Sequence, residues 1–232
     1  MNQFYFQFNT EEEGYEEIFL SSNGGEEEIF VEEPLNKTSE TSQPEEVIKL
    51  PEILPILPLR GLVVYPQTGV PLTIGQPRSI RLVDDIVTGD RIMGLVASKH
   101  PEIESPDPEH LYQVGTAGLI HRMFRAPDGT IRLLVQGLFR FRIIEFVATE
   151  PYLKARIEVI PEKQETGLEI EALARNVRDQ FAHIAEMIPS MPRELVATVT
   201  SITDPLQTVY TIANLQRMDI EDAQEILELD SI

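Results

Sequence analysis

The feature that most constrains the fold of this chain is a change in the spacing of its apolar residues at Pro161. Before it, from Leu50 to Ile160, apolar and β-branched residues form short runs that prolines and glycines interrupt, which is typical of strands and turns. After it, apolar residues recur every three or four positions, which is the period of an amphipathic helix. The sequence therefore predicts an α+β chain in which a β-rich part precedes a helical part.

Several segments of the first part have the pattern of a single element. Apolar runs predict strands at Val70–Gly75, Arg91–Ser98 and Leu153–Ile160. Apolar residues three and four positions apart predict a short helix over Ser79–Val87. The prolines between Leu50 and Pro66 favour short edge strands and bends over helix. Several short strands at close spacing indicate a small closed or nearly closed β-barrel.

The clearest local signal is a hairpin between Leu119 and Ile144. Its turn is predicted at Pro127–Gly129, because proline, aspartate and glycine suit the positions of a tight turn. In the strand that follows, apolar residues alternate with Arg140 and Arg142. Because successive side chains of a strand point to opposite faces, we expect one apolar face and one cationic face that meets solvent.

The second part contains four predicted helices. The first has a long apolar stripe over Ile170–Ile188 and ends near Pro189. Asp204 and Pro205 suit the N-cap and the first position of the third helix. The last apolar stripe begins at Ile220 and reaches the end of the given sequence without a stop signal. We therefore expect a longer helix there that the given sequence cuts short.

Negative charge is concentrated at the N-terminus. Residues 1–50 contain thirteen Glu, no Asp and two Lys, and so hold more than half of the formal net charge of −20. Such charge blocks bury too little surface to offset the entropy lost on ordering, which predicts a disordered acidic tail over residues 1–49. The aromatic residues near its start leave two interpretations open, an inert solubilising tail and a short docking motif.

The sequence lacks the motifs that catalysis and cofactor binding require. It contains no G-x-x-x-x-G-K-[ST], G-x-G-x-x-G or H-E-x-x-H, and no serine in G-x-S-x-G or S-x-x-K. The four histidines lack metal-ligand spacing, and the absence of cysteine excludes disulfides and thiolate ligands. We expect no catalytic residue, no cofactor and no metal in this chain. Without a membrane-length apolar run or a secretory signal, we expect a cytoplasmic location and no membrane partner.

Positive charge gathers around the predicted hairpin. The cluster comprises Arg122, Arg125, Arg132, Arg140 and Arg142. Such a cluster on a small β-barrel suggests nucleic-acid binding as one function. The chain as a whole is acidic, however, and no exposed aromatic residues are predicted between the arginines. The cluster is therefore interpreted as the solvent-facing side of paired strands, and a nucleic-acid partner is not expected.

Apolar residues near the surface are the remaining functional candidates. Met187, Ile188 and Met191 lie where the first predicted helix meets two prolines, and Met123 and Phe124 lie in the hairpin. Methionine is flexible and polarisable, so these residues suit contact with many unrelated apolar segments of a protein substrate. The alternative is that they pack in the core.

Several motifs, in order along the chain, resemble the N-terminal region of Lon proteases. LPILPLRGLVVYPQTGVPLTIGQPRSIRLV (Leu54–Val83) is similar to the opening of that family. The similarity continues through Pro108–Ile120, Pro127–Ile143 and Glu194–Pro205. The final QEILELDSI is similar to the start of the long helix that leads to the family's ATPase. The chain departs from the family pattern in loops, at Gln67 and at Gln76-Pro77.

The resemblance implies both a fold and a function. It implies a PUA-like β-barrel subdomain over residues 50–162 and a helical subdomain over 163–232. It also implies a non-catalytic region that captures unfolded, damaged or degron-bearing proteins for a hexameric ATPase and serine protease. ATP, Mg²⁺ and the Ser–Lys dyad belong to downstream parts of that family, so no catalytic residue is carried onto this sequence. A standalone adaptor or ligand-binding protein and an RNA-binding PUA-like barrel are the alternatives.

Overall fold

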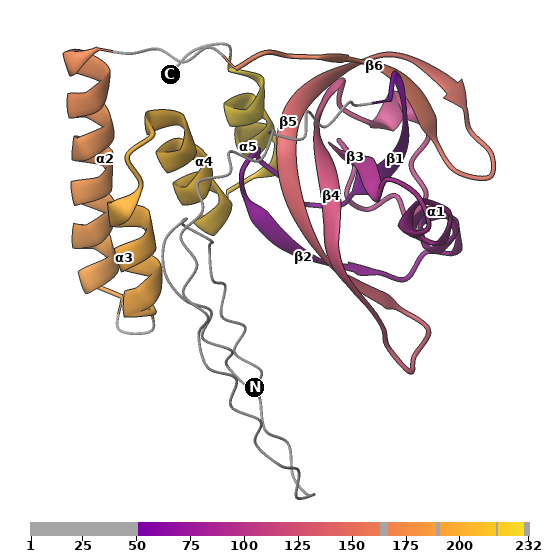
Figure 1. Cartoon of the computed structure of the whole chain (residues 1–232), viewed down its shortest axis with the longest axis horizontal. Coiled ribbons are helices and arrows are strands. Elements are labelled where there is room, and N and C mark those ends of the chain that lie inside the picture. Colours follow the sequence, from indigo (N-terminus) through magenta and orange to yellow (C-terminus); the bar gives the residue numbers. More distant parts are fainter. Residues whose placement is uncertain (1–50, 163–166, 189–190, 217, 230–232) are drawn as a thin grey trace, which may run out of the picture. The chain divides into compact units, whose positions relative to one another are not determined.

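The computed structural model describes residues 51–162, 167–188, 191–216 and 218–229 (Figure 1). The predicted tail over residues 1–49 lies outside the described residues. The strands are β1 (Ile53–Leu59), β2 (Gly69–Ile74), β3 (Ile92–Ala97), β4 (Val114–Arg125), β5 (Ile131–Ala148) and β6 (Lys154–Val159). The helices are α1 (Pro77–Val87), α2 (Leu168–Glu186), α3 (Arg193–Ser201), α4 (Pro205–Leu215) and α5 (Ile220–Glu228), with a 3₁₀ turn at Pro108–His110. The predicted strands, hairpin and first helix are confirmed.

Five of the strands pair in a closed ring. β1 pairs with β3 in parallel, and the pairs β3–β4, β4–β5, β5–β6 and β6–β1 are antiparallel. β2 pairs with the first part of β5, from Ile131 to Gln136. The prediction that the proline-rich β1 segment forms edge strands is wrong, because closure of the ring gives β1 a neighbour on each side.

β5 is 18 residues long and pairs with β4 along one edge, while its other edge pairs with two strands in succession. Register shifts interrupt its pairing with β4 and with β6, and such bulges bend a strand. Its first part therefore pairs with β2 and its later part with β6. Gly137 lies between these two parts, where an added Cβ would collide with the carbonyl oxygen of Tyr65. This close approach requires glycine.

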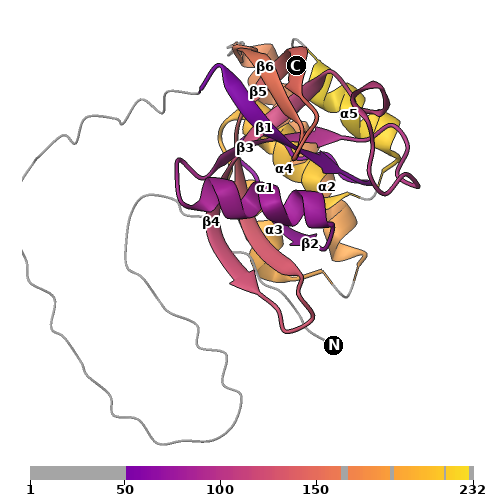
Figure 2. The same ribbon diagram turned by 90° about the vertical axis from the view of Figure 1, so that its right-hand side faces the viewer.

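Aliphatic side chains fill the barrel. The largest buried cluster joins residues of β1 to β5 with Leu82 and Val83 of α1. Ile80 and Ile86 of the same helix pack against that cluster, so α1 covers one side of the barrel (Figure 2). Burying one such side chain contributes about 1.5–3 kcal/mol, which makes this cluster the main stabilising element of the β-rich part.

Within the part of the chain that the structure describes, the helices take part in two further buried clusters. In the first, α2, α3 and α4 bring together Phe181, Val199 and Ile212. In the second, α4 and α5 pack on the barrel, where the rings of Tyr65 and Tyr210 stack with their centroids 5.5 Å apart. The hydroxyl of Tyr65 donates a hydrogen bond of 2.9 Å to the carbonyl oxygen of Ala223. Burial raises the pKa of both tyrosines to about 12.

Arg140 contradicts the prediction of a solvent-facing arginine. Its side chain is only 3% exposed, because α5 covers this part of β5. The guanidinium donates hydrogen bonds to the carbonyl oxygens of Leu227 (2.9 Å) and Leu229 (2.6 Å). α5 ends at Glu228, earlier than the continuing helix that the sequence predicts. A cation at this position satisfies carbonyl groups that have no partner within the helix and favours the negative end of the helix dipole.

Candidate functional site

The hairpin of β4 and β5 carries the first two candidate residues. Its tip extends past the other strands in both views (Figures 1 and 2). Phe124 is 62% exposed and Met123 is 36% exposed. An aromatic side chain with this exposure, on a strand rather than in a loop, is available for contact and is held by the ladder of the hairpin.

A bulge in β4 places Phe124 on the outer face. Ile120 pairs with Val135 and Arg122 pairs with Leu134, so His121 is an extra residue without a partner in this register. A bulge shifts the alternation of the strand by one position. Without it, Phe124 would lie on the same face as the buried Ile120.

The registers of three strands define the surface around Phe124. Phe124 lies opposite Arg132 of β5, which lies opposite Thr73 of β2. In the next row, Arg122 lies opposite Leu134, which lies opposite Pro71. Side chains directly opposite each other in a sheet share a face. We call this set the hairpin face: Arg122, Phe124, Arg132, Leu134, Pro71 and Thr73.

The predicted arginine cluster separates into different environments. Arg140 is buried, Arg125 forms an ion pair with Asp84 of α1, and Arg142 lies opposite Glu158 of β6. Arg122 and Arg132 are exposed, and among the described residues no carboxylate forms an ion pair with either. Phe124 lies opposite Arg132 and two residues from Arg122, which contradicts the prediction that no exposed aromatic residue lies between the arginines.

The turn of the hairpin is held by its own hydrogen bonds. The carboxylate of Asp128 accepts bonds from the backbone N–H (2.9 Å) and the hydroxyl (2.7 Å) of Thr130. These bonds lower the pKa of the Asp128 carboxyl. Gly129 has a φ of 86°, which glycine adopts without steric cost. The predicted turn is confirmed, and its internal bonds fix the register of the hairpin face.

The exposed side of α2 forms a second apolar surface. Its exposed large apolar residues are Leu168 (86%), Leu173 (57%), Val177 (39%) and Ile184 (50%), followed by Met187 (64%) and Ile188 (40%) just after the helix. The opposite side of α2 is buried through Ala174, Phe181 and Ala185. The predicted apolar stripe is thus wider than the side that α3 and α4 cover.

Two of the remaining candidates therefore share this surface, and one does not. Met187 and Ile188 are exposed, whereas Met191 is half-buried and packs against the cluster of Phe181 and Val199. Leu173 and Ile184 belong to the predicted apolar stripe of this helix but are exposed. Their neighbours Ala174 and Ala185 are the buried members of each pair. Adjacent apolar residues in a helix point about 100° apart, so one covered side rarely buries both.

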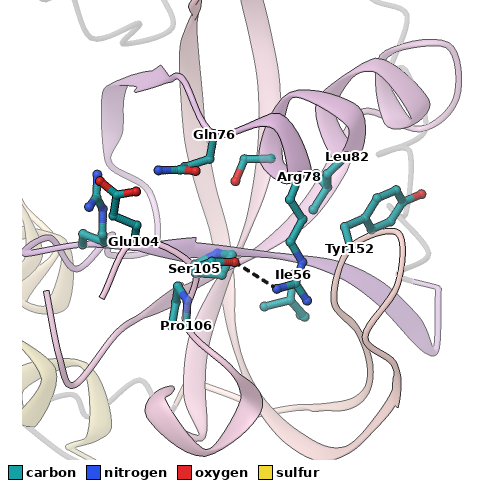
Figure 3. A pocket seen from close by; sticks show the side chains of 11 residues that line it. Ile56, Gln76, Arg78, Leu82, Glu104, Ser105, Pro106 and Tyr152 are labelled. Carbon is teal, nitrogen blue, oxygen red and sulfur yellow. Dashed lines mark hydrogen bonds between the residues drawn. The ribbon is translucent and has the colours of Figure 1, made fainter. Parts of the chain in front are cut away.

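A small pocket lies between β1, the start of α1 and the loop after β3 (Figure 3). Arg78 occupies it, donating to the carbonyl oxygen of Thr149 (2.7 Å) and to the hydroxyl of Ser105 (3.5 Å). These bonds tie α1 to two loops. Since Arg78 already bonds the protein's own groups, we assign the pocket a structural role.

The described residues contain no group of three or more His, Asp or Glu side chains placed to hold a metal ion. In the same part of the chain, none of the helices has the length and apolar composition that crossing a membrane requires.

Comparison with known proteins identifies the family. The model of the ATP-dependent protease La (LON) substrate-binding domain matches residues 53–232. The chain belongs to the LON substrate-binding domain family. This match covers every strand and helix described above, and it confirms the resemblance to the N-terminal region of Lon proteases.

Curated members of the family are much longer than this chain. The Lon protease of Dictyoglomus thermophilum is 48% identical over 179 residues, which is 77% of this chain and 22% of the relative. Lon protease 1 of Herpetosiphon aurantiacus is 43% identical over 196 residues, which is 82% of this chain and 24% of the relative. The chain thus spans less than a quarter of the length of either Lon protease.

A solved structure supports the fold. The N-terminal domain of the Mycobacterium avium complex Lon protease aligns with a TM-score of 0.58 over 77% of this chain and 91% of that domain. The sequences are 20% identical in this alignment, so the likeness establishes the fold alone. The mixed sheet followed by helices is therefore the architecture of a LON N-terminal domain.

Proposed function

We propose that this chain is the non-catalytic substrate-recognition region of a Lon-type ATP-dependent protease and that it binds unfolded or damaged polypeptides. The observation that carries the proposal is the exposed apolar pair Met123 and Phe124 on an internally held hairpin of a LON substrate-binding domain. Native proteins hide most large apolar side chains, whereas unfolded chains expose them. The exposed ring of Phe124 can therefore pack against the apolar side chains of an unfolded polypeptide, whereas a native protein offers it few such partners.

We propose that the catalytic steps belong to a longer protein. The relatives are named Lon protease, and their matched part is 22–24% of their length. In such a protein, the ATPase that uses ATP and Mg²⁺ and the serine protease would follow this region, and the ATPase would assemble as a hexamer. Capture of degron-bearing proteins at the recognition region would then supply the motor with polypeptide.

The test compares one polypeptide in two states. A small disulfide-bonded protein is labelled with a fluorophore and prepared both native and permanently unfolded by reduction and carboxymethylation. Fluorescence anisotropy with the full 232-residue chain measures binding of each form. We expect the unfolded form to bind at least about tenfold more tightly. Equal affinity for the two forms would contradict the proposal.

Variants locate the contact. Replacing Phe124 with Ser removes the exposed ring, and we expect the affinity for the unfolded form to fall about fivefold, because burying an aromatic side chain contributes on the order of 1 kcal/mol or more. Val147 is 41% exposed at the other end of β5, where that strand pairs with β6 and no longer with β4. Val147→Ser is therefore the matched control, and it should leave the affinity unchanged.

A further inference from the structure

The charged residues of the hairpin face are all positive, although the chain as a whole is negatively charged. The chain has a formal net charge of −20, but the segments Gly69–Ile74, Val114–Arg125 and Ile131–Ile144 contain no Asp or Glu. These segments are β2, β4 and the first part of β5, which lie side by side in the sheet. The nearest acidic residue along the chain is Asp128 in the turn, and its carboxylate is engaged by Thr130.

Charge and apolar surface alternate on this face. Phe124 lies opposite Arg132, and the neighbouring row has Arg122 opposite the half-buried Leu134. Each apolar side chain therefore has one arginine beside it across the strands and another two residues away along a strand. A ligand that covers Phe124 and Leu134 has to meet both guanidinium groups.

We propose that the hairpin face selects polypeptide segments in which an aromatic or aliphatic residue is flanked by acidic residues. This inference rests on the proposed function and names the class of segment that the region prefers. Apolar side chains of the segment cover Phe124 and Leu134, while its carboxylates lie against Arg122 and Arg132. Complementary charge at the hairpin face favours the binding of such segments over basic ones. A basic segment with the same apolar residues meets like charges at the same positions.

The observations favour a polypeptide over a nucleic acid. Arg122 and Arg132 are the two arginines of this face that have no ion-pair partner among the described residues. Two cations are a small number for a phosphate backbone, whose binding depends on many simultaneous contacts with phosphates. The chain's overall negative charge repels a backbone with one charge per nucleotide more strongly than it repels a polypeptide segment with a few carboxylates. The centre of the face is apolar, formed by Phe124, Leu134 and Pro71, which suits side chains of a polypeptide.

The test uses short fluorescent peptides and the full 232-residue chain. The first peptide has two aromatic residues flanked by glutamates, the second has lysines in place of the glutamates, and the third keeps the glutamates but has serines in place of the aromatics. A single-stranded RNA of similar length is the fourth probe. We expect the first peptide to bind about tenfold more tightly than the second or third, with an affinity that falls as salt is added.

Charge reversal on the protein should invert this preference. In the double variant Arg122→Glu and Arg132→Glu, the lysine peptide should bind more tightly than the glutamate peptide. Arg175 and Arg193 are exposed on α2 and α3, so the variant Arg175→Glu and Arg193→Glu is a control with the same change in net charge. The control should retain the preference of the unaltered chain.

The outcomes separate this inference from the proposed function. Equal affinity for the glutamate and lysine peptides, or tighter binding of the RNA than of any peptide, would overturn the inference. If the unfolded protein still binds more tightly than its native form, the proposed function stands without it. Loss of the preference for the unfolded form would instead overturn the function, whatever the peptides show.

Discussion

Arg132 and Arg140 lie on the same strand, and their surroundings differ completely. Arg132 is exposed on the hairpin face and has no ion-pair partner among the described residues. Arg140 is 3% exposed beneath α5 and donates hydrogen bonds to the backbone carbonyls of Leu227 and Leu229 at the C-terminal end of that helix. The difference arises from residues more than eighty positions later in the chain, which cover one part of β5 and leave the other open.

This contrast divides the outer surface of the sheet into a structural and an available region. The covered region holds Tyr65, Arg140 and Tyr210, with their polar groups bonded or buried. The open region holds Phe124 and two arginines that face solvent. Stability should therefore respond to changes in the covered region, while ligand binding should respond to changes in the open one.

The largest effect on stability is expected from Arg140→Ala. It leaves carbonyl oxygens at the C-terminal end of α5 without their charged donor and removes the cation that offsets the half-buried Glu162, whose pKa burial raises. We expect the free energy of unfolding to fall by about 3 kcal/mol, measured by urea denaturation. Arg132→Ala is the matched control and should change it by less than about 0.5 kcal/mol. Similar losses in both variants would remove the distinction between the two regions.

Substitutions at Gly137 and Gly129 test the same difference between the covered and the open region. In Gly137→Ala the new Cβ meets the carbonyl oxygen of Tyr65, so the backbone must shift, and we expect a loss of about 2 kcal/mol. In Gly129→Ala the new Cβ meets nothing, but the φ of 86° becomes unfavourable, and we expect about 1 kcal/mol. Thermal unfolding of both variants measures these losses. A larger loss at Gly129 would mean that the turn, rather than the covered region, limits stability.

The covered region should also be sensitive to alkaline pH. The pKa of Tyr65 and of Tyr210 is about 12 in the folded chain, against an ordinary value of 10.0. Between these values the unfolded chain releases the phenolic protons and the folded chain keeps them, so stability falls as pH rises. Each tyrosine should contribute about 1.4 kcal/mol per pH unit in this window. In the variant Tyr65→Phe the slope should be shallower by that amount, and an unchanged slope would contradict the assignment.

Much of the fold follows from local patterns in the sequence. Apolar runs place β2, β3 and β6, the spacing of Ile80, Val83 and Val87 places α1, and Asp204 accepts the expected capping bond from the N–H of Gln207 at 2.7 Å. These signals succeed because each depends on neighbouring residues alone. The capping bond in particular needs no knowledge of the tertiary fold.

Which side chains are exposed on the candidate binding surface depends on the pairing between strands and on cover by distant helices, which no local sequence pattern contains. The extra residue His121 turns Phe124 outward, and its effect depends on which residue of β5 each residue of β4 meets. The alternation of apolar and charged residues predicts that Arg140 faces solvent. This prediction fails because α5, a segment distant in the sequence, covers Arg140. The five candidate contact residues were found by type and position, and their role in binding remains a prediction.

The most direct test of binding at the hairpin face is amide hydrogen exchange, read by mass spectrometry, of the chain with and without the permanently unfolded polypeptide. The account predicts that the bound polypeptide slows exchange in peptides covering residues 119–136, while peptides covering the α4–α5 region stay unchanged. Binding that slows exchange elsewhere, for example over residues 168–188, and leaves the hairpin unaffected would contradict it.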